Sequence, residues 1–114
     1  MFLLALRKIL FGRSGIQNSI AVANMRRKRM AKFRCEVTGC SHKDCKLEVH
    51  HLLDVNRFPM FAASVWNLRV VRADIHDGYH SWMGGTHKGA DPISWYFFLL
   101  LLKLGMVKLY AKKS

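Results

Sequence analysis

The fold of this chain is decided by the stretch LEVHHL (residues 47–52), which is followed by NLRVV (residues 67–71) and then by His76 and His80. Both runs are rich in leucine and valine, and each has the length of a single β-strand. Asp74 is a suitable N-cap for a helix that carries the two later histidines. Two strands followed by a helix predict a small α+β domain in which the histidines meet.

The histidines in this stretch predict a division of roles. Successive side chains of a strand point to opposite faces, so His50 and His51 cannot share one role. His76 and His80 are four residues apart and therefore share one face of their helix. One strand histidine and both helical histidines can converge on a metal ion, which leaves the other strand histidine free to handle protons. If His50 is the ligand, His51 is the base, and Asn67 could fix its imidazole.

Further elements are predicted on both sides of the histidine stretch. Residues 33–37 form a predicted strand, which a turn at residues 38–39 connects to residues 47–52 in a hairpin. Residues 53–66 are irregular and contain a proline, so a loop with at most a short helical turn is expected there. The glycines at residues 84–85 are expected to end the histidine helix.

Helices are predicted at both ends of the chain. Residues 2–11 are apolar and are followed by two glycines, and a capping-box pattern then opens a helix over residues 15–32. Asp91 and Pro92 suit an N-cap and a first helical position, so a last, apolar helix is expected to run to Leu104. The predicted organisation is a basic helical arm (residues 1–32), a central core (residues 33–88), and an apolar helix with a basic tail (residues 89–114).

Basic charge is concentrated at the two ends of the sequence. The net charge is +12, and all seven acidic residues lie between Glu36 and Asp91, where six basic residues nearly cancel them. Residues 1–35 contain nine Lys and Arg and residues 92–114 contain four, with no acid in either part. Cationic arms around a nearly neutral centre predict a polyanionic partner, with nucleic acid first and an anionic membrane second. The candidate phosphate contacts of the first arm, which could also be a solvated helix end, are Arg26, Arg27, Lys28, Arg29, Lys32 and Arg34.

Composition and cysteine count exclude several classes of protein. A chain of 114 residues with 51% hydrophobic residues has the size and composition of one globular domain. Three cysteines do not make a closed disulfide framework, so reduced thiols or a metal site in the cytoplasm are expected. The apolar run of residues 93–102 is too short to span a bilayer, and the N-terminus lacks the basic region of a signal peptide.

The order of these residues resembles the HNH endonuclease motif and its ββα-metal (His-Me finger) fold. The resemblance rests on LEVHHL, on Asn67-Leu68, and on His76 and His80. It extends to FRCEVTG (residues 33–39), which is similar to the opening of many small HNH enzymes. It also extends to YHSWMGGT (residues 79–86), which is similar to phage-type homing endonucleases. The resemblance covers residues 33–88, and the flanking helices carry no part of it.

The resemblance implies an enzyme that cuts phosphodiester bonds of nucleic acid, with double-stranded DNA as the first expected substrate. The implied metal ligands are His50, His76 and His80, the implied general base is His51, and the implied orienting residue is Asn67. One divalent ion (Mg²⁺, Mn²⁺, Ni²⁺ or Zn²⁺) would be the cofactor. Arg69 and Arg72 could clamp the phosphate or could be ordinary exposed arginines of a strand edge. The expected setting is the cytoplasm of a bacterial or phage-infected cell.

A structural zinc site is expected only in altered form. Many relatives in the family carry two Cys-x-x-Cys pairs, and the second pair would fall at Arg72 and Ile75 of this chain. A four-cysteine site therefore cannot form within one chain. The spacing permits a Cys₃His site, with three reduced thiols as the alternative. Its ligands would be Cys35, Cys40, Cys45 and His42.

Other functions are left open by the sequence. A domain can keep a nuclease fold and serve only as a nucleic-acid-binding or assembly subunit. The apolar segments 1–11 and 95–104 could pack on one another, form a homodimer face or dock on a larger assembly. Together with the basic ends, these segments would also suit a protein of the membrane surface.

Overall fold

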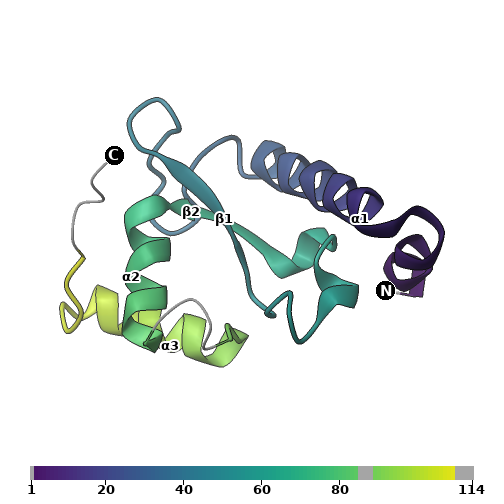
Figure 1. Ribbon diagram of the computed structural model, residues 1–114. Coiled ribbons are helices and arrows are strands. Elements are labelled where there is room, and N and C mark those ends of the chain that lie inside the picture. Colours follow the sequence, from purple (N-terminus) through teal and green to yellow (C-terminus); the bar gives the residue numbers. More distant parts are fainter. Residues whose placement is uncertain (1, 85–88, 110–114) are drawn as a thin grey trace.

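The computed structural model describes residues 2–84 and 89–109 of the chain. This part contains three α-helices and one two-stranded antiparallel sheet, so the predicted α+β class is confirmed (Figure 1). The elements in chain order are α1 (Phe2–Met30), β1 (Leu47–His51), the 3₁₀ turns η1 (Pro59–Phe61) and η2 (Val65–Asn67), β2 (Leu68–Arg72), α2 (Ala73–Met83) and α3 (Pro92–Lys103). The loop with a short helical turn that the sequence predicted over residues 53–66 corresponds to the segment with η1 and η2.

The sheet pairs β1 with β2, in a register that runs from Leu47 opposite Arg72 to His51 opposite Leu68. The predicted hairpin between residues 33–37 and 47–52 is wrong. In the described part of the chain, that first segment forms no strand, and its only β-bridge is the one from Arg34 to Ser41.

Backbone conformation and edge contacts explain why residues 33–37 are not a strand. Lys32 and Phe33 both have a φ of 56°, which lies in the left-handed region and turns the chain sharply after α1. Cys35 N donates to Cys40 O (2.9 Å), which closes a tight loop. Glu36 N then donates to Val70 O (2.7 Å), and the Glu36 carboxylate accepts from Val70 N (2.6 Å). One residue, rather than a strand, therefore satisfies the outer edge of β2.

The helices cover the two sides of the sheet. Figure 1 shows α1 on one side of the strands, with a bend in its N-terminal half, and α2 with α3 on the other. The core between the sheet and these last two helices contains Val71, Ile75, Tyr79, Trp95 and Phe98, all 0–1% exposed. The helix α3 therefore packs against α2, whereas α1 lies on the other side of the strands (Figure 1). Within the described residues, no helix combines the length and the apolar character that crossing a bilayer requires.

The ends of α2 and α3 follow local capping rules. The N-cap of α2 is Arg72 and not the predicted Asp74, whose carboxylate instead accepts from Ile75 N (2.9 Å) in the first turn. Gly84 ends the helix with a φ of 96°, as predicted. The Asp91 carboxylate accepts from Ser94 N (2.7 Å), so the predicted cap of α3 is confirmed. Because α2 begins directly after β2, the position of the helix is fixed by the sheet.

Candidate metal centre

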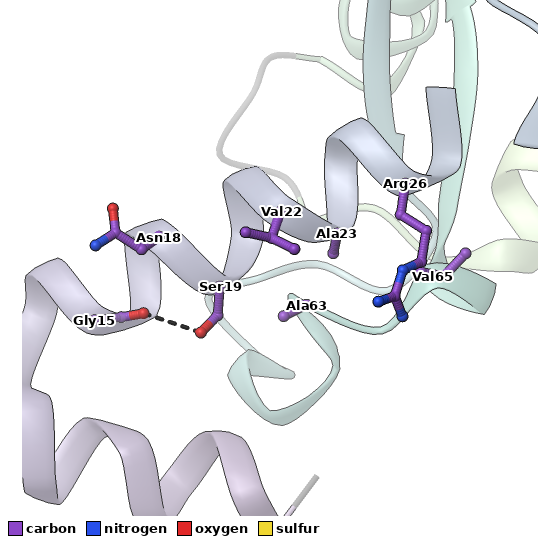
Figure 2. Close-up of a pocket in the computed structure, with 8 residues that line it drawn as sticks. All are labelled: Gly15, Asn18, Ser19, Val22, Ala23, Arg26, Ala63 and Val65. Carbon is purple, nitrogen blue, oxygen red and sulfur yellow. Dashed lines mark hydrogen bonds between the residues drawn. The ribbon is translucent and has the colours of Figure 1, made fainter. Parts of the chain in front are cut away.

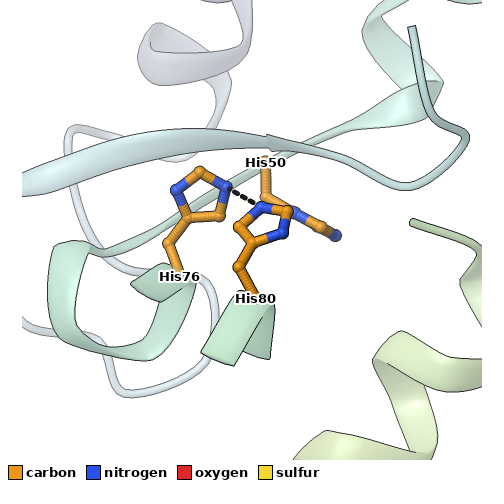
Figure 3. A group of neighbouring side chains, drawn as sticks. All are labelled: His50, His76 and His80. Atoms are coloured by element: carbon orange, nitrogen blue, oxygen red, sulfur yellow. Dashed lines mark hydrogen bonds between the residues drawn. The ribbon is translucent and has the colours of Figure 1, made fainter. Parts of the chain in front are cut away.

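Three histidines converge between the sheet and α2. His50 points from β1 toward α2, where His76 and His80 lie one turn apart on the facing side (Figure 3). One ring nitrogen from each histidine lies within 4.8 Å of the others. The Nε2 atoms of His76 and His80 are 3.1 Å apart. Nitrogens bound at about 2.0–2.1 Å to a tetrahedral ion lie roughly 3.3 Å apart, so this spacing fits a shared ion.

The environment of His50 supports the same interpretation. The ring is 1% exposed and is stacked on Trp95, with 4.1 Å between ring centroids. Its Nε2 atom is buried and has no hydrogen-bond partner among the described residues. Burial, followed by the neighbouring His76 and His80, lowers the pKa of His50 to about 2. The ring is therefore neutral, as a metal ligand must be, and an ion would satisfy a nitrogen that is otherwise costly to bury.

Glu48 is a functional candidate that sequence reasoning missed. His76 donates from Nδ1–H to the Glu48 carboxylate (3.1 Å), which fixes the ring with the lone pair of Nε2 directed at His80. A carboxylate on the second nitrogen is the usual support for a metal-ligating histidine. Its position could have been found, because Glu48 and His50 are two residues apart on a strand and so share a face. Asp77 also brings a ligand atom within 4.8 Å of Glu48 and His76, but it is exposed.

His51 lies beside the three candidate ligands and differs from them in its hydrogen bonding. It lines a cavity of about 160 Å³, the histidine cavity, together with Val49, His50, Asp54, Val55, His76, His80 and Ala90. Its Nε2–H donates to Ala62 O (3.0 Å), because a carbonyl can only accept. The lone pair therefore lies on Nδ1, and burial lowers the pKa of this imidazole. A neutral ring with a fixed tautomer suits a general base.

Asn67 ties the segment after His51 to the start of β2. The side chain is fully buried, and its Oδ1 accepts from Leu53 N (2.8 Å). Its Nδ2 donates to Leu53 O (3.2 Å) and to Phe61 O (3.2 Å). Ala62, whose carbonyl holds His51, follows Phe61 directly. The predicted tie between the loop after His51 and the start of β2 is therefore present. The role of Asn67 in orienting the imidazole stays a prediction.

The two arginines that the sequence indicated as phosphate clamps are engaged by other groups of the protein. Arg69 donates to the carbonyls of Trp66 (3.0 Å) and Leu68 (2.7 Å), and Arg72 forms an ion pair with Asp74. Neither of these arginines lines the cavity.

Arg57 lies at the rim of the histidine cavity instead. Its NH2 donates to Ala90 O (3.0 Å), and its Nε lies 3.5 Å from the Asp54 carboxylate. Ala90 and Asp54 both line the cavity, and the Arg57 side chain is 53% exposed. A β-carbon at Gly89 would lie 3.1 Å from the guanidinium, so the glycine leaves room for it. No pattern in the sequence pointed to this loop residue.

The basic cluster of α1 divides into bound and available side chains. Arg27 forms an ion pair with Glu36 (2.5 Å) and is 15% exposed, so it is part of the structure that holds the 33–45 loop. Arg34 donates to Gly39 O (3.0 Å). Within the basic cluster of residues 26–34, the side chains of Arg26, Lys28 and Arg29 in α1, and of Lys32 just after it, make no ion pair or hydrogen bond with the described residues.

A larger cavity, of about 450 Å³, lies between α1 and the η1–η2 segment (Figure 2). Arg26, Asn18 and Ser19 line it, and the Ser19 hydroxyl donates to Gly15 O (3.0 Å). This cavity is separate from the histidines and contains no metal-ligating side chain, so it does not compete with the histidine cavity as a catalytic site.

The cysteine loop does not assemble the Cys₃His site that the spacing permitted. Cys35 is buried in the core, and the thiols of Cys40 and Cys45 both approach Ser41 O. The ring of His42 packs against Phe33, with 5.4 Å between centroids. Among the described residues, no three of the four proposed ligand atoms lie within 4.8 Å of one another. The cysteines are free thiols, and burial together with the Cys40 thiol raises the pKa of Cys45 to about 11.

Comparison with known proteins does not add to this geometry. The resemblance carried by residues 33–88 stays a prediction, and the site is interpreted from its own residues. Searches against protein-family models, curated proteins and solved structures found no match for this chain.

Proposed function

We propose that the protein is a metal-dependent endonuclease that hydrolyses phosphodiester bonds of DNA, with a ββα-metal core of the HNH type formed by β1, β2 and α2. One observation carries the proposal: three histidine nitrogens lie within 4.8 Å of one another, and a fourth histidine with an unprotonated Nδ1 lines the same cavity. A metal ligand set beside an independent base is the combination that hydrolysis of a phosphodiester requires.

The basic side chains around the site would bind the substrate. Arg57 stands at the rim of the histidine cavity with part of its guanidinium in solvent, and this group pairs well with phosphate oxygens. The free cations of α1 would contact the DNA backbone further away, where they add affinity without sequence preference. Binding would therefore begin with charge, and the cavity would select the bond to be cut.

Each residue of the site would have a separate role in phosphodiester hydrolysis. A divalent ion held by His50, His76 and His80 would stabilise the negative charge that develops on the phosphate and the leaving oxygen. His51 Nδ1 would accept the proton of the attacking water, while the carbonyl of Ala62 keeps its Nε2 protonated. Glu48 would hold His76 in the tautomer that a ligand needs. The Asn67 bonds would keep the loop behind His51 in place.

Nicking of supercoiled plasmid in the presence of Mg²⁺, Mn²⁺ or Ni²⁺ tests the proposal. The wild type should convert supercoiled to open-circular DNA, and His51→Ala should lose at least about 100-fold in rate, the range of general-base contributions. Arg57→Ala should raise KM more than it lowers kcat, because the guanidinium binds substrate. Equal background from the wild type and His51→Ala with every metal would contradict catalysis. DNA binding without cutting would then favour the alternative, a non-catalytic nucleic-acid-binding or assembly subunit.

A further inference from the structure

Two thiols of the cysteine loop converge on one backbone carbonyl. The Cys45 thiol donates to Ser41 O, with 3.3 Å between sulfur and oxygen, and the Cys40 thiol donates to the same oxygen at 3.7 Å. Ser41 O also accepts from the backbone N–H groups of Asp44 (2.9 Å) and Cys45 (3.1 Å), which closes residues 41–45 into a tight turn. Two sulfurs that meet at a single oxygen across such a turn lie close together. We call Cys40 and Cys45 the thiol pair.

The thiol pair is accessible, whereas the third cysteine is not. Cys40 and Cys45 are half-buried, and both line a cavity of about 490 Å³ that Lys46 and the first residues of α2 also line. Cys35 is 2% exposed and belongs to the core, where its sulfur accepts from Thr38 N (3.4 Å). A small reagent can therefore reach two neighbouring thiols, while packing protects the other one.

We propose that the thiol pair is a modification site, at which Cys40 and Cys45 form a reversible disulfide by exchange with a low-molecular-weight disulfide such as glutathione disulfide. Oxidation selects thiols that are accessible and have a second thiol beside them. A disulfide at such an exposed position is also more easily reduced again than one in a core. The pair lies outside the histidine cavity, so this proposal does not rest on the proposed nuclease function.

The exchange has two steps. The Cys40 thiolate attacks one sulfur of glutathione disulfide, which forms a mixed disulfide at Cys40 and releases one glutathione thiolate. Cys45 then loses its proton and its sulfur attacks the Cys40 sulfur, so that the bond between Cys40 and Cys45 forms as the bond to glutathione breaks. The protein loses two electrons and two protons. Glutathione disulfide gains them and becomes two molecules of glutathione.

The surroundings of Cys45 give it the second role in this sequence. Burial, followed by the neighbouring Cys40 thiol, raises the pKa of Cys45 to about 11, so this thiol is protonated at neutral pH. Because the thiolate is the attacking species, Cys45 is a poor first nucleophile. Once Cys40 carries glutathione, however, the Cys45 sulfur is already held beside the sulfur that it must attack. Proximity of the reacting atoms then offsets the small fraction of thiolate.

Peptide mapping of the reduced full chain after treatment with glutathione disulfide, in the presence of a metal chelator, tests the proposal. Free thiols are first blocked with N-ethylmaleimide. Trypsin cuts after Arg34, Lys43 and Lys46, so residues 35–43 and residues 44–46 are released as separate peptides unless a disulfide joins them. The wild type should yield the joined peptides, with fragmentation placing the bond at Cys40 and the blocking group on Cys35. Excess reduced glutathione should separate the peptides again.

Two serine variants test the order of attack and serve as controls for each other. Cys45→Ser should stop at the mixed disulfide on Cys40, because the second thiol is missing. Cys40→Ser should take up glutathione about tenfold more slowly than Cys45→Ser, because the remaining thiol holds little thiolate. Neither variant should give joined peptides. Equal or reversed rates of glutathione uptake would overturn the order of attack.

Phenylarsine oxide tests the geometry of the folded protein without oxidation, because it binds two thiols at once. The reduced wild type should bind one equivalent, and either serine variant should bind it at least about 100-fold more weakly, since a single sulfur loses the effective concentration of the second. Circular dichroism verifies that the variants keep the fold. The proposal would be overturned by equal arsenical affinity in the wild type and the variants. A wild type that carries glutathione on Cys40 without closing, or a bond that involves Cys35 or a second chain, would also overturn it.

Discussion

His50 and His51 are adjacent and chemically identical, but the atoms around their rings give them different hydrogen-bonding states. His50 lies on Trp95 in the core, and its Nε2 has no hydrogen-bond partner among the described residues. His51 donates from its Nε2 to Ala62 and keeps its Nδ1 unprotonated. The strand alternation separates the two side chains, and their surroundings then specialise them. One ring is positioned to bind an ion, and the other has the unprotonated nitrogen that the proposed general base needs.

The hydrogen bond between Glu48 and His76 predicts an effect on metal affinity. Glu48→Ala should weaken binding of Zn²⁺ or Ni²⁺ by about 10–100-fold, because His76 loses the carboxylate that fixes its tautomer. Isothermal titration calorimetry measures the affinity. Glu48→Gln is the matched control, since its amide oxygen can still accept from Nδ1–H, and it should retain most of the affinity. Unchanged binding by Glu48→Ala would show that this hydrogen bond does not support the site.

The thiol of Cys45 predicts a pH-dependent reactivity. Its pKa is raised from 9.0 to about 11, so the folded protein holds roughly 100-fold less thiolate at a pH below 9 than the unfolded chain does. With metal chelated, alkylation of Cys45 by iodoacetamide should be slower by that factor in the folded protein, and its rate should rise as the pH approaches 11. Mass spectrometry of the labelled peptide gives the rate. Equal rates in folded and denatured protein would refute the raised pKa.

At the scale of elements, the loop over residues 33–45 is the segment whose structure the hydrophobic pattern did not predict. The strands β1 and β2 and the helices α2 and α3 were predicted because strand length, capping residues and glycine ends are local properties. The partner of β1 was predicted wrongly, because a hairpin was assumed for the nearest apolar run. The choice depends on the left-handed turn at Lys32 and Phe33 and on the side-chain bond from Glu36 to Val70. Neither of these features appears in a hydrophobic pattern.

The hydrogen bonds of Asn67 predict a large effect of its substitution on the free energy of unfolding. Asn67→Ala should lower the free energy of unfolding by about 3 kcal/mol, because it leaves several backbone groups of Leu53 and Phe61 without their partner. Urea denaturation measures the change. Asn56→Ala is the control at an exposed position of the same loop, and its effect should stay within about 0.5 kcal/mol. Equal effects of the two substitutions would contradict the structural role of Asn67.

At the scale of the whole molecule, three features lie on separate surfaces. Exposed cations lie on α1, the histidine cavity is lined by residues of β1 and α2, and large exposed apolar residues lie on α3. The sequence singled out four histidines and Asn67 because their order and spacing are distinctive, and the structure brings His50, His76 and His80 together. Glu48 and Arg57 were missed, since their importance comes from a neighbour that only the fold supplies. The last helix was recognised as apolar, but which of its residues stay exposed became known only from the packing against α2.

The free cations of α1 predict a salt dependence of DNA binding. Replacing Arg29 and Lys32 with glutamine should reduce the slope of log affinity against log salt by about 2, because each substitution removes one ionic interaction with a phosphate. The matched control replaces Lys43 and Lys46, which are also exposed but lie outside the basic cluster of residues 26–34, and should change the slope little. Fluorescence anisotropy with a labelled duplex, in the His51→Ala background to prevent cutting, gives both slopes. Identical slopes for the two pairs would remove α1 from the DNA interface.

The most direct test of the metal centre separates ligands from base by titration of Ni²⁺ into four single variants. The geometry predicts one ion per chain in the wild type and unchanged affinity in His51→Ala. It predicts at least about tenfold weaker binding in each variant that loses a ligand, namely His50→Ala, His76→Ala and His80→Ala. The assignment of ligands and base would be contradicted if His51→Ala lost as much affinity as the other three, or if none of the four substitutions changed it.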